Sequence, residues 1–277
     1  MGVSIRRFKK FNILLKIVGT LTTFFIFSSC ATLNLTMPVP ELESPQHHGR
    51  QNGVGFEVTG GSGSQLSLTD DPSKRPFIAA NQNQKVDDVF IMKPGINWYA
   101  LSRLTVTAGV VDSKSPFLRA KISLLNGYRE DTEIGRYQMS FTTEASFQHA
   151  ETSGNQNGAG GAVGFPWKGT SQLLYGKASL SFGMQMTRKM LPFIGYSYQQ
   201  FQTYGVIDQT AAGSDAGGSF KIQPEYGTVQ AVGLGLDWKI SPRFYIMPQA
   251  LYYQTKWYDK SLNQIGGSLR LIYVPIQ

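Results

Sequence analysis

Three patterns in the sequence predict an all-β protein: a single antiparallel up-and-down β-barrel that crosses a membrane with about ten strands, with eight or twelve as alternatives. The patterns are a period-two alternation of apolar and polar residues, connections that are alternately tight and long, and aromatic residues at one end of several strands. The expected domains are a signal peptide over residues 1–29, a Pro-rich tether over 30–52 and the barrel over 53–277.

The alternation is clearest over residues 137–149, where the apolar side chains of Tyr137, Met139 and Phe141 alternate with polar ones. Because successive side chains of a strand point to opposite faces, one side of this strand suits hydrocarbon and the other suits water. The same split recurs along the chain. The expected strands lie at residues 54–58, 90–98, 104–111, 118–124, 137–149, 174–186, 191–204, 226–238, 244–257 and 264–273.

The connections between these strands differ in length. Those at 101–103, 187–189 and 241–243 are tight, whereas those at 60–88, 150–172 and 205–224 are long. Outer-membrane barrels have short periplasmic turns and longer external loops. An even number of strands therefore places both ends of the barrel on the periplasmic side, and the tether with them.

Aromatic residues give a separate indication of a membrane. Trp98, Tyr137, Trp238 and Tyr273 share the apolar parity and fall at the periplasmic ends of their strands. Aromatic girdles at the membrane interfaces are typical of membrane barrels. A soluble β-sandwich, with these aromatics in its core, is the alternative.

The N-terminus has the organisation of an export signal. Arg6, Arg7, Lys9 and Lys10 precede an apolar run over residues 17–27, and small residues then lead to Cys30, the one cysteine of the chain. Phe27-Ser28-Ser29-Cys30 resembles a bacterial lipobox, which implies cleavage before Cys30 and lipidation of its thiol. Ala31 implies sorting to the outer membrane. The alternative is an ordinary cleaved signal peptide in which Cys30 is incidental.

The charge balance does not favour a nucleic-acid partner. Five of the 26 basic residues precede Cys30, which leaves 21 against 18 acidic residues, or a net charge of +3 in place of +8. The tether that follows is rich in proline and charge, and it has too little apolar surface to pack, so we expect it to be solvated. Its His47 and His48 are expected to be solvated as well, without a metal.

The last strand adds a resemblance. Gln264-Ile265-Gly266-Gly267-Ser268-Leu269-Arg270-Leu271 resembles the assembly signal of bacterial outer-membrane β-barrel proteins, and no subfamily is indicated. This resemblance implies a Gram-negative cell envelope protein, surrounded by outer-membrane lipid, that meets the barrel-assembly and lipoprotein-sorting machineries.

The inward parity bears on function. It carries a mixed set of charges that would pair within a narrow lumen: Glu57, Lys93, Arg119, Lys121, Glu144, Lys177, Asp237 and Arg270. We therefore predict a structural or surface-displayed interaction protein with a lumen filled by side chains. No catalytic, cofactor-binding or metal site is predicted, and the sequence names no external ligand.

Two other functions remain open. The first is a small-molecule channel or transporter gated by the long Gly-rich loops. A continuous hydrated path through the lumen would favour this function, whereas charges paired across the centre would favour the filled barrel. The second is an outer-membrane hydrolase that uses His149 near the external rim as a base. Asp70 and Asp71 resemble the paired carboxylates of ten-stranded omptin proteases, although no Asp-His pair accompanies them.

Overall fold

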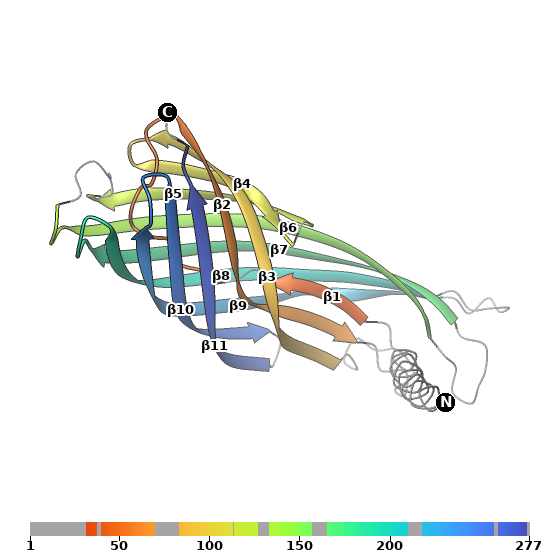
Figure 1. Ribbon diagram of the computed structural model, residues 1–277. Coiled ribbons are helices and arrows are strands. Elements are labelled where there is room, and N and C mark those ends of the chain that lie inside the picture. The colour runs from red at the N-terminus through yellow and green to blue at the C-terminus, as the bar shows by residue number, and fades with distance from the viewer. Residues whose placement is uncertain are drawn as a thin grey trace, which may run out of the picture.

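The computed structural model describes residues 32–37, 40–69, 83–112, 114–126, 133–156, 165–209, 218–257 and 260–275. Ten strands form a closed antiparallel barrel in which β2 pairs with both β3 and β11 (Figure 1). They are β2 (Gly53–Thr69), β3 (Asn83–Leu101), β4 (Leu104–Val111), β5 (Ser115–Leu125), β6 (Tyr137–Gln156), β7 (Phe165–Met184), β8 (Met190–Gln209), β9 (Gly218–Lys239), β10 (Phe244–Trp257) and β11 (Lys260–Tyr273). The predicted all-β up-and-down barrel is confirmed. Among the described residues, no helix is long and apolar enough to cross a membrane.

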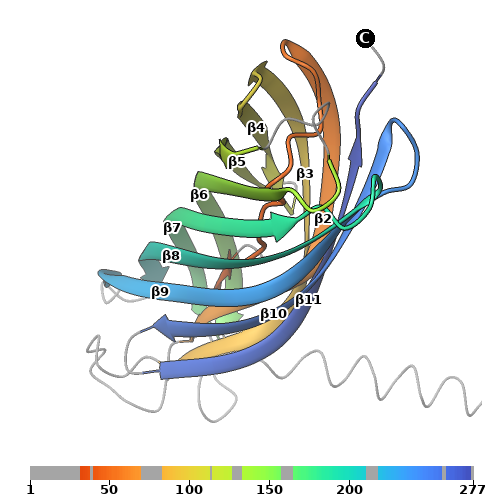
Figure 2. The ribbon, with the colours of Figure 1, turned by 90° about the vertical axis from the view of Figure 1, so that its left-hand side faces the viewer.

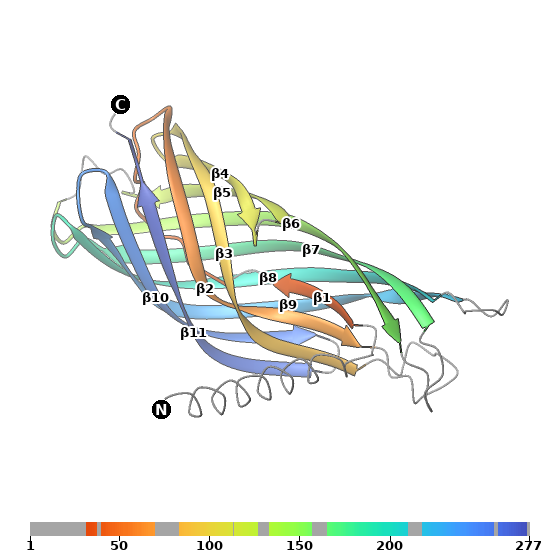
Figure 3. The same cartoon turned by 45° about the vertical axis from the view of Figure 1, so that its right-hand side comes forward.

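An eleventh strand was not expected. β1 (Thr32–Met37) pairs antiparallel with the second half of β2, from Thr32 opposite Thr69 to Met37 opposite Ser64. It lies beside the end of β2 in Figure 3. This strand falls within the segment expected as a tether.

The wall alternates as predicted between an apolar outer face and a polar inner face. On β6, Phe141 and Phe147 are exposed on the outside, whereas Thr142 and Glu144 are buried inside. The same split continues on β7, where Leu174 and the other outward residues alternate with buried ones. The period-two pattern of the sequence thus identifies the two faces of the wall correctly.

The two rims of the barrel differ. The turn rim carries the connections at 102–103, 185–189 and 240–243, together with the start of β2 and the end of β11. The opposite rim, here called the hairpin rim, carries the far ends of β6 to β9, which are 20 to 22 residues long, so that the wall there extends well beyond β4 and β5 (Figure 1). Figure 2 views the strands from the side of the turn rim. The connections of the hairpin rim are shorter than predicted because β2 continues to Thr69 and β6 continues to Gln156.

The barrel is closed by a short seam. β11 and β2 share six residue pairs, from Ser268 opposite Gly61 to Tyr273 opposite Phe56, whereas β10 and β11 share fourteen. Beyond Gly61, β2 leaves β11 and pairs with β1 instead. Closure of the wall therefore depends on few hydrogen-bonded pairs.

Gly61 stands at the end of this seam, and a larger residue there is expected to open it. A Cβ at Gly61 would lie 2.7 Å from the carbonyl oxygen of Gly267 and 2.7 Å from the Cβ of Ser268, so the two strands would have to separate. Gly61→Val should lower the temperature at which the folded, fast-migrating gel form converts to the unfolded form. Gly176→Val is the matched control, since nothing lies within 4 Å of a Cβ at Gly176. Equal conversion temperatures for the two variants would contradict this account of the seam.

Candidate functional site

The lumen contains the chain's own N-terminal segment. All residues from Pro40 to Gly49 are buried, and the segment ends at the turn rim, where the amide of Asn52 donates a hydrogen bond of 2.6 Å to the carbonyl of Tyr99. We call residues 40–49 the lumen segment. The expectation of a solvated tether is wrong for these residues. The small apolar surface of the segment suggested solvation, but its acidic side chains pair with bases of the barrel wall.

Glu41 is the centre of the ionic network in the lumen. Its Oε1 lies 2.8 Å from the Nζ of Lys93, 3.1 Å from Arg270 and 3.2 Å from Arg119, with Lys177 at 3.9 Å. The side chains of Glu41, Lys93 and Arg270 are fully buried. One carboxylate of the lumen segment therefore collects cations from four strands, β3, β5, β7 and β11.

Glu43 pairs with Arg119 and Arg270, two of the cations that also contact Glu41. Its Oε1 lies 2.8 Å from the Nη1 of Arg119, and its Oε2 accepts a hydrogen bond of 2.5 Å from Arg270. Arg119 also donates to Glu57 of the wall. The guanidinium of Arg119 thus connects the lumen segment to β2.

Glu144 of β6 completes the network. It accepts hydrogen bonds of 2.6 Å from Lys93 and 2.8 Å from the hydroxyl of Tyr175, and Lys177 lies 3.6 Å away. Phe117 packs against Lys93 and Arg119, with its ring centroid 4.3 Å from the Nζ of Lys93 and 5.7 Å from the Cζ of Arg119. Every charge in this layer has an opposite charge within reach.

The lumen segment balances the charge of the wall. At this level the wall contributes four bases, Lys93, Arg119, Lys177 and Arg270, but only two acids, Glu57 and Glu144. Glu41 and Glu43 supply the two missing negative charges. An unpaired buried ion costs several kcal/mol, so the pairing of the segment with the wall stabilises the folded state of both.

A second polar layer lies toward the turn rim. Asp237 accepts a hydrogen bond from Ser44 and lies 2.6 Å from the Nε2 of His48, and Lys121 donates to the carbonyl of Gln46 at 2.7 Å. The expectation that His47 and His48 are solvated is wrong, since both are buried. Their rings pack against aromatic rings of the wall, His47 against Tyr99 and His48 against Tyr245.

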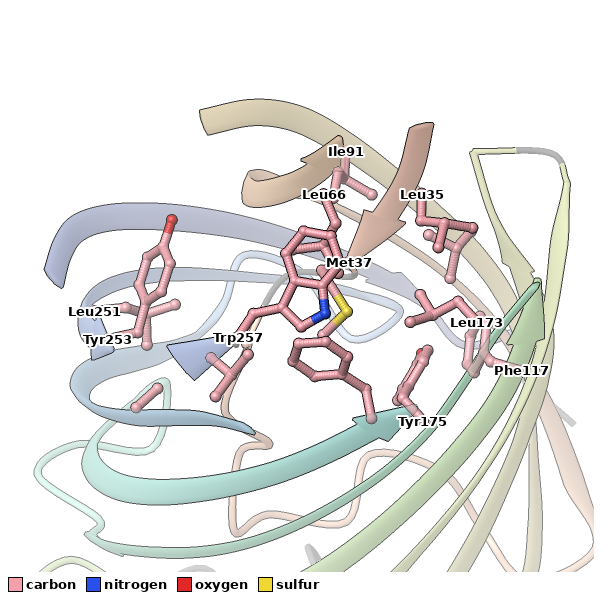
Figure 4. Close-up of a cluster of buried hydrophobic side chains, with 14 of the residues drawn as sticks. Leu35, Met37, Leu66, Ile91, Phe117, Leu173, Tyr175, Leu251, Tyr253 and Trp257 are labelled. Carbon is pink, nitrogen blue, oxygen red and sulfur yellow. The ribbon is translucent and has the colours of Figure 1, made fainter. Parts of the chain in front are cut away.

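An apolar layer fills the lumen toward the hairpin rim. Leu33, Leu35 and Met37 of β1 are fully buried against wall residues such as Trp257 and Leu173 (Figure 4). β1 is fixed further by the amide of Thr36, which donates to the side chain of Gln148 at 3.0 Å. The lumen therefore has an apolar layer, an ionic layer and a polar layer, and the N-terminal chain contributes to each.

A small void lies between the lumen segment and the wall. The void lined by Glu43, His48, Glu57, Arg119 and Lys121, among others, has a volume of about 10 Å³. A cavity of that size holds about one water molecule. At this level, described residues of the segment and of the wall surround the void.

The structure places the sequence-predicted residues as follows. All eight inward charges are buried in the lumen: Glu57, Lys93, Arg119, Lys121, Glu144, Lys177, Asp237 and Arg270. The four aromatics, Trp98, Tyr137, Trp238 and Tyr273, lie on the outer face near the turn rim and are 41–52% exposed. Cys30, Asp70 and Asp71 lie outside the described residues. His149 is half-exposed and lies 3.4 Å from Glu151.

Sequence reasoning missed the acids and the serine of the lumen segment, Glu41, Glu43 and Ser44. The excess of inward bases over inward acids was the available signal for an acidic partner. Among the described residues, no group of three or more His, Cys, Asp or Glu side chains could hold a metal ion.

The outer surface of the wall carries many exposed apolar side chains. Large apolar side chains such as Phe90, Leu118, Ile194 and Leu234 are 54–71% exposed around the barrel. A closed wall that is apolar outside and polar inside is the form in which strands cross a bilayer. The chain is a transmembrane β-barrel.

No protein-family model matches this chain, and no curated protein matches it. Solved structures with a similar fold include the outer-membrane protease OmpT of Escherichia coli, with 10% identity and a TM-score of 0.42 over 85% of this chain and 100% of that chain. The attachment invasion locus protein Ail of Yersinia pestis has 12% identity and a TM-score of 0.32 over 81% of this chain and 99% of that chain. Neisserial surface protein A has 12% identity and a TM-score of 0.28 over 80% of this chain and 98% of that chain.

Proposed function

We propose that the protein is a structural or surface-displayed interaction protein of the outer membrane whose lumen is permanently closed by its own N-terminal segment. The observation that carries this proposal is the position of Glu41 and Glu43 among the four wall bases. A transport path along the axis would need these ion pairs to break. In the proposed orientation the hairpin rim lies outside the cell, where partners can bind it, and the turn rim lies in the periplasm.

The same observation bears on the alternative of a channel. Lys93 bridges Glu41 and Glu144, so that opposite charges are paired across the centre of the barrel. A pore needs a continuous hydrated path, and the lumen segment occupies that space together with a small void. We therefore place the filled barrel ahead of the channel.

The alternative of a hydrolase has less support from the rim. A serine nucleophile needs a histidine base within hydrogen-bond reach. Within the described part of the chain, His149 contacts the carboxylate of Glu151 and no serine hydroxyl donates to it. We therefore propose a non-enzymatic role.

Lipidation at Cys30 is part of the proposal. The lipobox resemblance of residues 27–30 supports it, and delivery would use the lipoprotein-sorting and barrel-assembly machineries. Outer-membrane lipid is the partner expected along the exposed apolar wall.

Conductance in planar lipid bilayers tests the closed lumen. The purified wild-type protein is expected to give no steady conductance, because residues 40–49 fill the ionic layer. Glu41→Gln/Glu43→Gln should give transient openings, since the segment loses its attachment to the bases of the wall. Glu151→Gln is the matched control, because the side chain of Glu151 is 78% exposed and lies outside the network. A large steady conductance from the wild type would show that the barrel is a pore.

A further inference from the structure

The chain enters the barrel at the hairpin rim. In the register of β1 with β2, Thr32 lies opposite Thr69, at the far end of β2, and Met37 lies opposite Ser64. β1 therefore runs from the hairpin rim toward the turn rim. The side chains of Leu33 and Leu35 are fully buried in the apolar layer of the lumen, so β1 packs against the inner face of the wall.

The chain leaves the lumen at the turn rim. After the buried lumen segment, the amide of Gly53 donates to the carbonyl of Arg50 at 2.9 Å, and Gly53 begins β2 opposite Tyr99. β11 ends at the same rim, where Tyr273 pairs with Phe244. Both ends of the barrel itself thus lie at the turn rim, as predicted, but Thr32, the first described residue of the segment expected as a tether, lies at the other rim.

The passage is fixed by contacts along its length. Gln249 of β10 accepts from the amide of Leu42 at 2.9 Å and donates to its carbonyl at 2.8 Å. The side chain of Gln249 thus satisfies both backbone groups of Leu42, as the backbone of a neighbouring strand would. Gly49 passes so close to Tyr99 that a Cβ would lie 2.0 Å from its ring. Such contacts indicate a built path through the lumen.

We infer that the chain threads its own barrel, so that it enters the lumen beside Thr32 at the hairpin rim, on the outer surface of the cell, and leaves it at the turn rim. The assignment of the hairpin rim to the outside rests on the proposed function. Cys30 is two residues from Thr32, a span of at most about 7 Å at the length of an extended chain. An acyl group on Cys30 therefore belongs to the outer leaflet, although the barrel itself begins and ends in the periplasm.

Site-specific labelling in intact cells tests the threading. Asn34→Cys places a thiol at an exposed position of β1. Lys260→Cys marks the hairpin rim and Ser102→Cys marks the turn rim, both at exposed positions. Each variant is treated with a membrane-impermeant maleimide before and after the outer membrane is permeabilised, and the wild-type chain with its single Cys30 serves as the blank.

Asn34→Cys is expected to label as Lys260→Cys does, in intact cells and without permeabilisation. If it labels as Ser102→Cys does, only after permeabilisation, the threading is overturned. If Ser102→Cys labels in intact cells while Asn34→Cys and Lys260→Cys do not, the proposed orientation fails and the threading stands. Should Asn34→Cys fail to fold, a protease site inserted between Ala31 and Thr32 replaces it. Cleavage of that site in intact cells, where Lys260→Cys also labels, supports the inference. Protection of the site until permeabilisation, while Lys260→Cys labels in intact cells, overturns it.

Discussion

Replacing Glu41 and Glu43 together with glutamine is expected to destabilise the folded barrel by about 3–5 kcal/mol or more, the usual cost of leaving buried charges unpaired. The substitution keeps the size of both side chains but leaves the four wall bases facing only Glu57 and Glu144. Folded and unfolded forms can be separated by their gel mobility in unheated samples. The urea concentration at half-unfolding measures the loss.

Glu151→Gln is again the matched control, because it removes an exposed carboxylate from the same protein. Its unfolding midpoint should stay at the wild-type value. If Glu41→Gln/Glu43→Gln also unfolded at the wild-type urea concentration, the lumen segment would not stabilise the wall.

Arg119→Met is expected to be the most damaging single substitution of the lumen. Arg119 contacts the carboxylates of Glu41, Glu43 and Glu57, and its guanidinium lies within 5.7 Å of the centroid of the Phe117 ring. Methionine keeps much of the buried aliphatic volume but removes the charge shared by these acids. We expect a loss of about 3–5 kcal/mol, seen as a lower urea midpoint than that of any exposed arginine variant.

Arg243→Met provides the comparison, since Arg243 lies exposed in the turn before β10. A double-mutant cycle with Glu43→Gln then tests the pairing itself. Because the two side chains are in contact, the combined loss should be smaller than the sum of the single losses. Strict additivity would mean that the 2.8 Å contact between Arg119 and Glu43 contributes no coupling.

The wall of this barrel is readable from its sequence for a simple reason. Each strand has one face in lipid and one in the lumen, so an apolar residue such as Phe141 stands beside a polar one such as Thr142. A shift of one residue would reverse both faces, which is why the pattern also fixes the parity of Glu57, Lys93 and Arg270. The positions of inward charges followed from the same rule.

The lumen segment could not be found in that way. Residues 40–49 form no strand, and their partners are remote in sequence: Glu41 and Lys93 are 52 residues apart, and Glu43 and Arg270 are 227 apart. A low apolar content indicates solvation only when no charged surface is available for pairing. Here the excess of bases on the inner wall reverses that expectation.

β1 escaped prediction because it is short and its pairing is not local. Its six residues alternate Leu33, Leu35 and Met37 with polar neighbours, yet they precede the proline-rich stretch that suggested a tether. Counting ten strands placed the barrel ends correctly, but the parity rule did not account for an additional pass through the lumen. The start of the N-terminal segment was therefore predicted at the wrong rim of the barrel.

Hydrogen exchange of residues 40–49, followed by mass spectrometry on the folded barrel in detergent, tests the central claim most directly. The amide of Leu42 donates to Gln249 and that of Gln46 donates to Ser44, in a segment that is buried throughout. We expect peptides from this segment to exchange as slowly as those from β6 and β7. Complete exchange of these amides at the earliest time point, with the wall strands still protected, would show that the segment lies outside the lumen. That result would contradict a lumen closed by residues 40–49.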